Sequence, residues 1–274
     1  TPRLESYAKA KTGVYELISL SERIHQPALP AIAVVDLREE FKKKNFSIFS
    51  LLLQRKIAER LKNREQVILF VNQRGMARAV VCRDCGHTEQ CPHCDISLKY
   101  HRGVQRGSED RLVCHYCGFV KTPPAVCPAC QSPYIRHLGV GTERVEEETR
   151  KLYPLARVIR ADRDTTNGKA GFEPIYKAFL AHEYDVLIGT QMVAKGLDFE
   201  RVSLIGIVLA DIGMSIPDFR SHERLFQLIT QVAGRCGRSL TQAGEVVLQT
   251  YQPHHPAIQQ AAAYGYEVFA NQEL

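Results

Sequence analysis

The feature that most constrains this chain is a block of four closely spaced cysteine pairs. Each pair has the spacing C-x-x-C, and the pairs are Cys82/Cys85, Cys91/Cys94, Cys114/Cys117 and Cys127/Cys130. This spacing lets two sulfur atoms face one metal ion, and two such pairs complete a tetrahedral Cys₄ site. A single pair would also fit a redox motif, whereas four pairs in one short block predict two structural zinc ions.

Disulfide bonds and an iron–sulfur cluster are the other uses of such cysteines. Disulfides require an oxidising compartment, and Thr1 to Ser6 resemble neither the basic nor the apolar part of a secretory signal. No stretch approaches the roughly eighteen apolar residues of a membrane helix. Evenly paired cysteines also suit tetrahedral zinc better than a cluster-type cysteine run. We therefore expect a cytoplasmic protein whose reduced cysteines bind zinc.

The sequence leaves two arrangements of the pairs open. The segment between Cys85 and Cys91 is too short for neighbouring pairs to fold back onto one ion. The pairs therefore either nest, with the outermost two sharing one ion and the innermost two the other, or interleave. We favour nesting, because the inner ribbon can then fold as a local hairpin. Both sites would be filled by cysteine, which leaves no open position for catalysis at the metal.

Outside the cysteine block, apolar strands alternate with helices. Val67 to Val71 is an unbroken apolar run, typical of a strand that is buried on both faces of a parallel sheet. Strands are also expected at 31–35, 78–82, 135–140, 157–161, 185–190, 203–210 and 244–250, and helices at 48–63, 142–152, 171–183, 221–233 and 256–270. This alternation predicts an α/β domain with a doubly wound parallel sheet.

The pattern divides the chain into three parts. Residues 82–134 interrupt the alternation and would form the zinc-binding insertion. Residues 47–81 and 135–274 would form the α/β lobe. Residues 1–46 look like the end of a preceding unit followed by a linker, and we expect this part to be partly disordered without its packing partner.

One segment near the end of the chain combines arginines with glycines. Gln231, Arg235 and Arg238 have the spacing i, i+4 and i+7, which places them on one face of a helix. Two arginines on one face repel each other unless an anion lies between them, and guanidinium groups stabilise the charge that develops in phosphoryl transfer. Gly234 and Gly237 would let another surface approach. A solvated basic face is the alternative, but it would not require the glycines.

Two strand ends carry further polar side chains. The strand at 185–190 brings Thr190 and Gln191 to the carboxyl edge of the sheet, where ligands bind in open α/β folds. These groups suit a phosphate of nucleic acid, as does the basic turn that contains Arg74 after the strand at 67–71. The residues that suit a nucleotide follow shortly after Gln191 and are Lys195, Gly196 and Asp198.

Together these motifs resemble the C-terminal lobe of superfamily-two helicases, and more narrowly the family of primosomal replication-restart helicases. The segments that carry the resemblance are Thr1–Ser6, Asn72–Gly75, Gly139–Glu143, Asp162–Thr165, Ile188–Met192, Pro217–Arg220 with Glu223 and Arg224, and Gln231–Arg238. The cysteine block lies where that family carries a zinc insertion, and nested pairing agrees with it. Gln73 and Cys236 depart from the family pattern, which has Arg and Ala there.

The resemblance implies a RecA-like fold in a bacterial, cytoplasmic, ATP-dependent 3′-to-5′ DNA helicase that restarts stalled forks and assembles the primosome. It implies that Arg235 and Arg238 face the γ-phosphate of ATP and that Gln231 couples two lobes. Nucleotide contacts are implied for Lys195, Gly196 and Asp198, and contacts with DNA phosphates for Thr190, Gln191, Arg74 and Thr142. The implied partners are single-stranded and forked DNA, primosome proteins and single-strand-binding proteins. Residues 1–46 would then be the end of the first lobe with a linker.

The chain lacks two elements that an ATP-driven motor needs. It contains no G-x-x-x-x-G-K-[ST] loop to hold phosphates and no D-E-x-H segment to hold Mg²⁺. We therefore expect ATP and Mg²⁺ to bind only in a longer protein and these residues alone to be inactive. The alternative function is a zinc-ribbon module that binds nucleic acid or protein on an inert α/β scaffold. Eight zinc-bound thiolates outweigh two Zn²⁺ and would lower the formal charge of +6, so charge alone does not decide between them.

Overall fold

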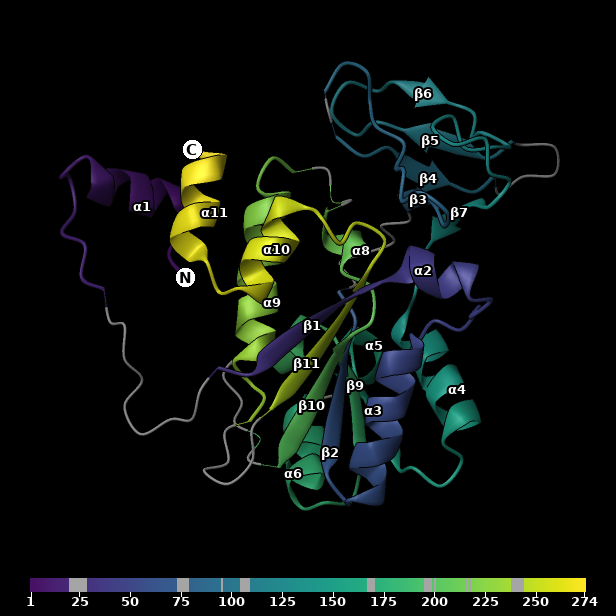
Figure 1. Cartoon of the computed structure of the whole chain (residues 1–274), viewed down its shortest axis with the longest axis vertical. Coiled ribbons are helices and arrows are strands. Elements are labelled where there is room, and N and C mark those ends of the chain that lie inside the picture. The colour runs from purple at the N-terminus through teal and green to yellow at the C-terminus, as the bar shows by residue number, and fades with distance from the viewer. Residues whose placement is uncertain are drawn as a thin grey trace.

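A parallel sheet runs through the centre of the α/β lobe (Figure 1). In the order β1-β11-β10-β2-β9-β8, its described strands are β1 (Ala31–Asp36), β11 (Glu245–Thr250), β10 (Val202–Ile207), β2 (Gln66–Phe70), β9 (Val186–Gly189) and β8 (Val158–Ala161). The structure, a computed structural model, describes residues 1–19, 29–72, 79–94, 96–103, 109–166, 171–194, 199, 201–214, 216, 218–237 and 244–274. All six strands run in the same direction.

Helices cover both faces of this sheet. In chain order they are α1 (Leu4–Lys11), α2 (Leu37–Lys42), α3 (Leu51–Lys62), α4 (Thr142–Leu152), α5 (Arg163–Thr166), α6 (Glu173–Leu180), α7 (Gln191–Ala194), α8 (Asp211–Met214), α9 (Ser221–Ala233), α10 (Pro256–Ala262) and α11 (Tyr266–Glu273). None of the helices in the described part of the chain is both long and apolar enough to cross a membrane.

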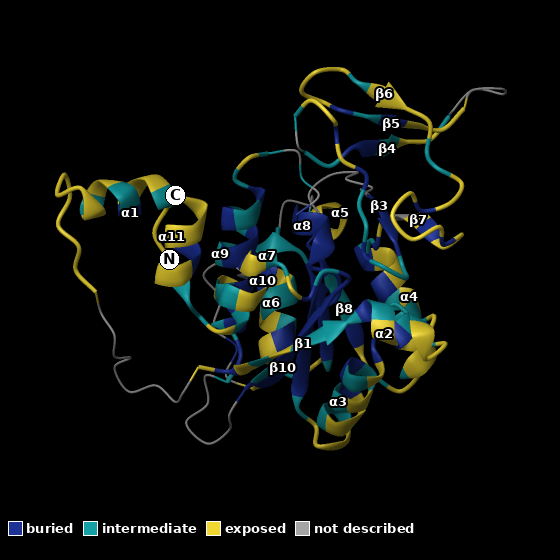
Figure 2. Cartoon of the chain, turned by 45° about the horizontal axis from the view of Figure 1, so that its top comes forward, coloured by how far each residue is buried: buried dark blue, intermediate teal, exposed yellow. Residues whose placement is uncertain are grey.

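The central strand β2 shows why the sheet needs helices on both sides. Its side chains alternate between two cores, because successive residues of a strand point to opposite faces. Ile68 and Phe70 pack with apolar residues of α6, α9, α10 and α11. Val67 and Leu69 pack with residues of α3 and α4, among them the fully buried Ile57. The strands are correspondingly the most buried part of the lobe (Figure 2).

A smaller module stands at the carboxyl edge of the sheet, where β2 leads into it (Figure 1). Its root is an antiparallel pair, β3 (Ala79–Cys82) with β7 (Ile135–Leu138). Above the root, β4 (Lys99–His101), β5 (Arg111–Val113) and β6 (Val120–Lys121) form a second antiparallel sheet. Leu98 and Leu112 are buried among the cysteines, so the module has a small core of its own.

The predicted fold class, a doubly wound parallel sheet with a cysteine-rich insertion, is confirmed. Three expected elements differ in detail. The strands expected at 78–82 and 135–140 pair with each other rather than joining the parallel sheet. The strand expected at 31–35 is the edge strand β1 and pairs with β11, although residues 1–46 were expected to lie outside the lobe. The last expected helix, 256–270, is two helices.

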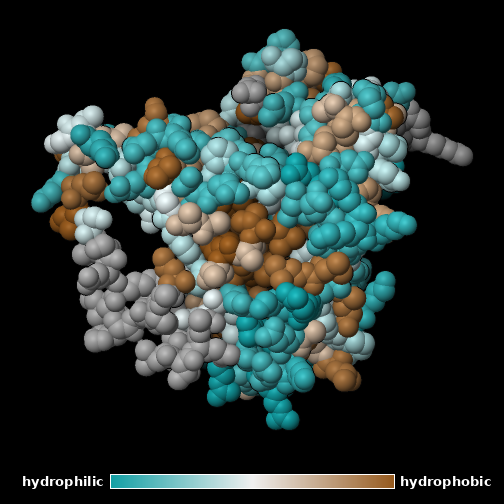
Figure 3. Space-filling view, in the orientation of Figure 1, coloured by the Kyte–Doolittle hydropathy of each residue, from teal (hydrophilic) through white to brown (hydrophobic). Residues whose placement is uncertain are grey.

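Because β1 lies at the edge of the sheet, part of the lobe's surface there is apolar. Within the described part of the chain β1 pairs on one side only, and its side chains are exposed or half-buried along its length. A patch of apolar residues is visible over β1 and α10 at the centre of Figure 3. The N-terminal helix α1 lies beside α11, and Tyr7 of α1 contacts Tyr266 with ring centroids 5.4 Å apart.

Candidate functional site

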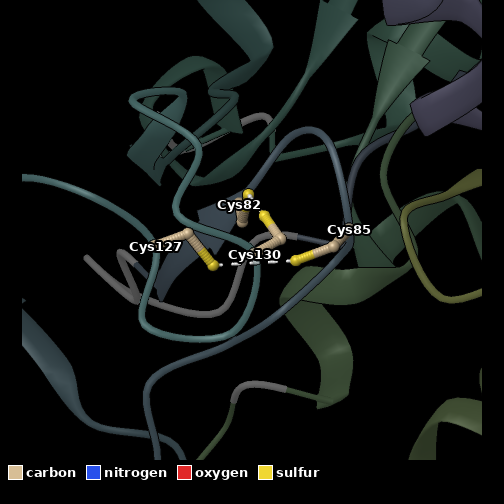
Figure 4. Close-up of side chains that lie close together, drawn as sticks. All are labelled: Cys82, Cys85, Cys127 and Cys130. Carbon is tan, nitrogen blue, oxygen red and sulfur yellow. Dashed lines mark hydrogen bonds between the residues drawn. The ribbon is translucent and has the colours of Figure 1, made fainter.

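The eight cysteines of the module form two separate groups of four. The outer group is Cys82, Cys85, Cys127 and Cys130, and the inner group is Cys91, Cys94, Cys114 and Cys117. Within each group all sulfur atoms lie within 4.8 Å of one another. Figure 4 shows the four side chains of the outer group turned toward a common centre. The nested arrangement that we favoured from the spacing is therefore the one found.

The sulfur–sulfur distances distinguish metal binding from disulfides. In the outer group, Cys82 Sγ lies 3.6 Å from Cys130 Sγ, and Cys85 Sγ lies 3.6 Å from Cys127 Sγ. A disulfide would bring two sulfurs to about 2.05 Å. Four thiolates bound tetrahedrally at about 2.3 Å from a zinc ion lie about 3.8 Å apart. Each group therefore has the size and donor set of a tetrahedral Cys₄ metal site.

Each cysteine pair is held in shape by its own backbone. The amide of the first cysteine donates a hydrogen bond to the carbonyl five residues later, from Cys82 to His87, Cys91 to Ile96, Cys114 to Phe119 and Cys127 to Ser132, all at 2.8 Å. Among the described residues, the residue that follows the second cysteine is left-handed in three of these turns, at Gly86, Gly118 and Gln131. These turns place both sulfurs of a pair within reach of one ion.

The outer group also anchors the module on the lobe. Gly86 has φ +80°, and a Cβ atom added there would lie only 2.4 Å from the carbonyl oxygen of Tyr251. Tyr251 follows β11 directly. On the other side, Arg38 forms an ion pair with Asp36 at the end of β1 and reaches the carbonyl oxygen of Cys85 at 3.4 Å. The outer metal site is thus fixed against the carboxyl edge of the sheet.

The carboxyl edge also carries the polar residues predicted from the strand ends. Gln191, at the start of α7, and Gln231, on α9, line one pocket of about 350 Å³. Asn72, which follows β2, lines the same pocket, and its Oδ1 atom is buried without a hydrogen-bond partner among the described residues. Thr190 lies beside this pocket at the end of β9 and is half-buried.

Other residues of this pocket carry the family resemblance in the sequence but were assigned no role at the site. Arg220 and Arg224 line it, and they form ion pairs with Glu5 and Asp218. Glu223 is almost fully buried and accepts a hydrogen bond from the backbone amide of Leu4 at 3.0 Å. These residues precede or begin α9, where the helical pattern shows only an amphipathic face. They reach the sheet edge through the segment that connects β10 to α9, and the path of that segment cannot be read from the sequence.

Thr142 has a different environment from the one expected. Its hydroxyl is buried and donates a hydrogen bond to Asp162 Oδ2 at 2.6 Å. Burial alone would raise the pKa of Asp162, but the hydrogen bonds from Thr142 and the Thr165 amide, with the charge of Arg160, outweigh burial and lower it. The structure brings Thr142 and Asp162 together as a local link between α4 and the end of β8.

The segment with the two arginines is not one continuous helical face. Helix α9 ends at Ala233 and is capped by Gly234, so Arg235 lies in the following turn. Gly237 has φ +65°, which an α-helix does not contain. The prediction that Gln231 and Arg235 share a helix face is therefore wrong, because the helix ends at Ala233 before Gly234. Cys236 in this turn is buried, and burial raises the pKa of its thiol to about 12.

Five predicted site residues lie outside the described part of the chain. They are Arg74, Lys195, Gly196, Asp198 and Arg238.

Comparisons with known proteins find relatives for both the cysteine-rich module and the whole chain. The inner ribbon, residues 91–121, matches the family described as the PriA DNA helicase Cys-rich region domain. The whole chain is 50% identical to replication restart protein PriA of Bacillus subtilis and covers 33% of it. It is also 42% identical to the PriA protein of Synechocystis over the whole chain and 33% of that protein. The chain spans about a third of the length of these curated relatives.

Solved structures are more distant. The chain resembles the Pyrococcus furiosus Hef helicase domain with 14% identity and a TM-score of 0.33, over 79% of this chain and 27% of that one. The yeast DEAD-box splicing factor Prp28 gives 12% identity and a TM-score of 0.40, over 98% of this chain and 40% of that one. These two likenesses are too weak to add to what the sheet itself shows. Over its whole length the chain is therefore similar to about a third of a replication restart protein PriA, and its inner ribbon is similar to the cysteine-rich region of PriA helicases.

Proposed function

We propose that this chain is the second motor lobe, with its zinc insertion, of an ATP-dependent 3′-to-5′ DNA helicase that restarts stalled replication forks and assembles the primosome. The observation that supports this most is the 50% identity with a replication restart protein over the whole chain. The nested Cys₄ groups at the carboxyl edge of a parallel sheet add independent support.

The arginine turn after α9 would serve ATP hydrolysis. Arg235 and Arg238 would stabilise the charge that develops on the γ-phosphate, as guanidinium groups do in phosphoryl transfer. Gln231 would couple the two lobes, and Lys195, Gly196 and Asp198 would contact the nucleotide. The phosphate-binding loop and the Mg²⁺ ligands would come from additional polypeptide, because this chain contains neither motif. We therefore propose that the 274 residues alone are inactive.

The carboxyl edge of the sheet would hold the tracking DNA strand. Thr190, Gln191 and Arg74 would contact its phosphates. Thr142 would contribute through the N-terminal amides of α4 rather than its hydroxyl, because that hydroxyl already donates to Asp162. Helix N-termini favour phosphate through their free amides and dipole.

The cysteine groups would each hold one structural zinc ion. Four thiolates fill the coordination sphere, so the metal would stabilise the module and supply no catalytic chemistry. The proposed partners are single-stranded and forked DNA, primosome proteins and single-strand-binding proteins. A replication function of this kind would place the protein in the bacterial cytoplasm.

The experiment that tests this function is ATP hydrolysis by a longer polypeptide that contains both lobes, with and without forked DNA. We expect DNA to stimulate hydrolysis, and Arg235→Ala to lower the rate by about 10³-fold or more. Arg55→Ala, which removes an exposed arginine of α3, is the matched control and should hydrolyse ATP normally. A wild type that hydrolyses no ATP with any DNA would leave the chain as a zinc-bearing binding scaffold.

A further inference from the structure

We propose that single-stranded nucleic acid crosses the junction between the cysteine-rich module and the lobe, with its bases stacked on exposed aromatic rings. This inference rests on the proposed function and adds to it a strand-binding surface. We call this region the junction surface, and its residues are Phe41, Lys43, Phe46, Arg83, Tyr134 and Arg144.

A row of three aromatic rings forms the middle of the junction surface. Phe41 belongs to α2 of the lobe, Phe46 follows that helix, and Tyr134 immediately precedes β7 of the module. The ring centroid of Phe41 lies 5.4 Å from that of Phe46 and 4.9 Å from that of Tyr134, both in edge contacts. Figure 1 shows α2 at the base of the module, close to β7.

The two outer rings of the row are accessible. Phe46 is 64% exposed and Tyr134 is 49% exposed. The module is also joined to the lobe at Gly86 and Cys85, and the two outer rings remain exposed beside that joint. Exposed aromatic rings spaced along a surface are the stacking platforms that single-strand-binding proteins use for successive bases.

Cations border the aromatic row. Arg83 and Arg144 line the same small recess as Phe41 and Phe46. Lys43, which lies between the two phenylalanines in the sequence, is exposed. Arg83 Nε is buried without a hydrogen-bond partner among the described residues.

The recess contains one carboxylate, Glu40, beside the two arginines Arg83 and Arg144, so positive charge prevails among its lining residues. Glu40 is buried, and it accepts hydrogen bonds from the Asn45 side chain at 2.7 Å and from the Leu51 amide at 2.8 Å. Its carboxylate therefore serves to hold the turn after α2. Positive charge beside stacking rings favours a polyanion with flat bases over an acidic peptide, which would use the charge but not two separate exposed rings.

The test uses the zinc-loaded 274-residue chain and an end-labelled oligothymidylate. The chain contains no tryptophan, so Phe46→Trp places a single fluorescent reporter on the junction surface. Oligonucleotide anisotropy measures binding at any site, whereas quenching of the tryptophan measures stacking at this one. We expect saturable quenching, and about fivefold or more weaker binding for Phe46→Ala and Tyr134→Ala.

Two matched controls separate local from general effects. Tyr15→Ala removes an exposed aromatic ring that has Lys9 over its face. It follows α1, which Figure 1 shows on the opposite side of the lobe from the module. Arg55→Gln removes an exposed cation of α3. Both should bind like the wild type, whereas Arg144→Gln should reduce the salt dependence of binding by about 0.7 in log–log slope.

Each result decides between the two proposals. DNA binding by the wild type, together with no quenching in Phe46→Trp and with Phe46→Ala binding no more weakly than Tyr15→Ala, would overturn the junction surface and leave the proposed function standing. It would then favour a protein partner for the exposed rings. If the wild type does not bind DNA at all at low salt, both the junction surface and a DNA contact by this chain are wrong.

Discussion

The contact between Gly86 and Tyr251 can be tested with two equivalent glycines. Gly86 and Gly118 occupy the same position in their cysteine turns, with φ of +80° and +76°. Alanine at either position incurs the cost of a left-handed conformation, about 1–2 kcal/mol. The surroundings differ, because a Cβ at Gly118 meets nothing within 4 Å, whereas one at Gly86 lies 2.4 Å from the Tyr251 carbonyl oxygen.

The difference in unfolding free energy between Gly86→Ala and Gly118→Ala therefore measures the contact of Gly86 with Tyr251 alone. Carbon and oxygen approach to about 3.3 Å at closest in ordinary contacts, so the turn at Gly86 must move away from the lobe by nearly an ångström. Overpacking of this kind typically costs 1–3 kcal/mol. We expect Gly86→Ala to lower the free energy of unfolding by about 1–3 kcal/mol more than Gly118→Ala does.

Urea unfolding of the zinc-loaded chain, followed by circular dichroism, measures this difference. If the module separates from the lobe instead of straining it, the loss appears as faster zinc release to a chelator from Gly86→Ala. Equal unfolding free energies together with equal zinc-release rates in the two variants would show that the Gly86–Tyr251 contact does not hold the module on the lobe.

The nested cysteine groups and the buried carboxylate of Asp211 allow two further predictions. Cys91→Ser combined with Cys114→Ser damages only the inner group, so the chain should keep about one zinc ion, whereas Cys82→Ser with Cys114→Ser should lose both; metal analysis that finds the reverse would contradict nesting. Burial raises the pKa of Asp211 to about 6, partly opposed by hydrogen bonds from Tyr251 and Thr250. Because the folded pKa lies above the unfolded value of about 3.9, this group adds stability as pH falls from about 7 toward 4. In urea unfolding, the free energy of unfolding of the wild type should rise relative to that of Asp211→Asn as the pH falls over that range. A difference between the two that does not change with pH would contradict the raised pKa of Asp211.

Features that depend on local spacing were predictable from the sequence. The helices expected at 142–152 and 221–233 have those bounds in α4 and α9. In α9 an apolar stripe at helical spacing determines where the helix lies and which face is buried, whereas α4 is predicted from Thr142 and Glu143 in its first turn. The cysteine turns were predictable for the same reason, since each pair forms its own turn within a few residues.

Strand partners were not predictable, because an apolar run does not specify its neighbour. Residues 78–82 and 135–140 looked like strands of the main sheet, yet Val80 and Ile135 pack in the module's own core with the cysteines. The strand at 31–35 looked like part of a linker, since its alternation is too short to distinguish an edge strand from an exposed one. Only its pairing with β11 places it in the lobe.

The position of the outer metal site depends both on local cysteine spacing and on which strands are neighbours in the sheet. The spacing of the cysteines predicts the site, but its attachment depends on residues from three strand ends that are far apart in the sequence. Asp36 after β1 holds Arg38 against Cys85, and Tyr251 after β11 blocks any side chain at Gly86. Asp211 after β10 accepts hydrogen bonds from the Tyr251 amide at 3.0 and 3.1 Å. Because the sheet edge holds the metal site at several points, movement of the lobe would carry the module with it.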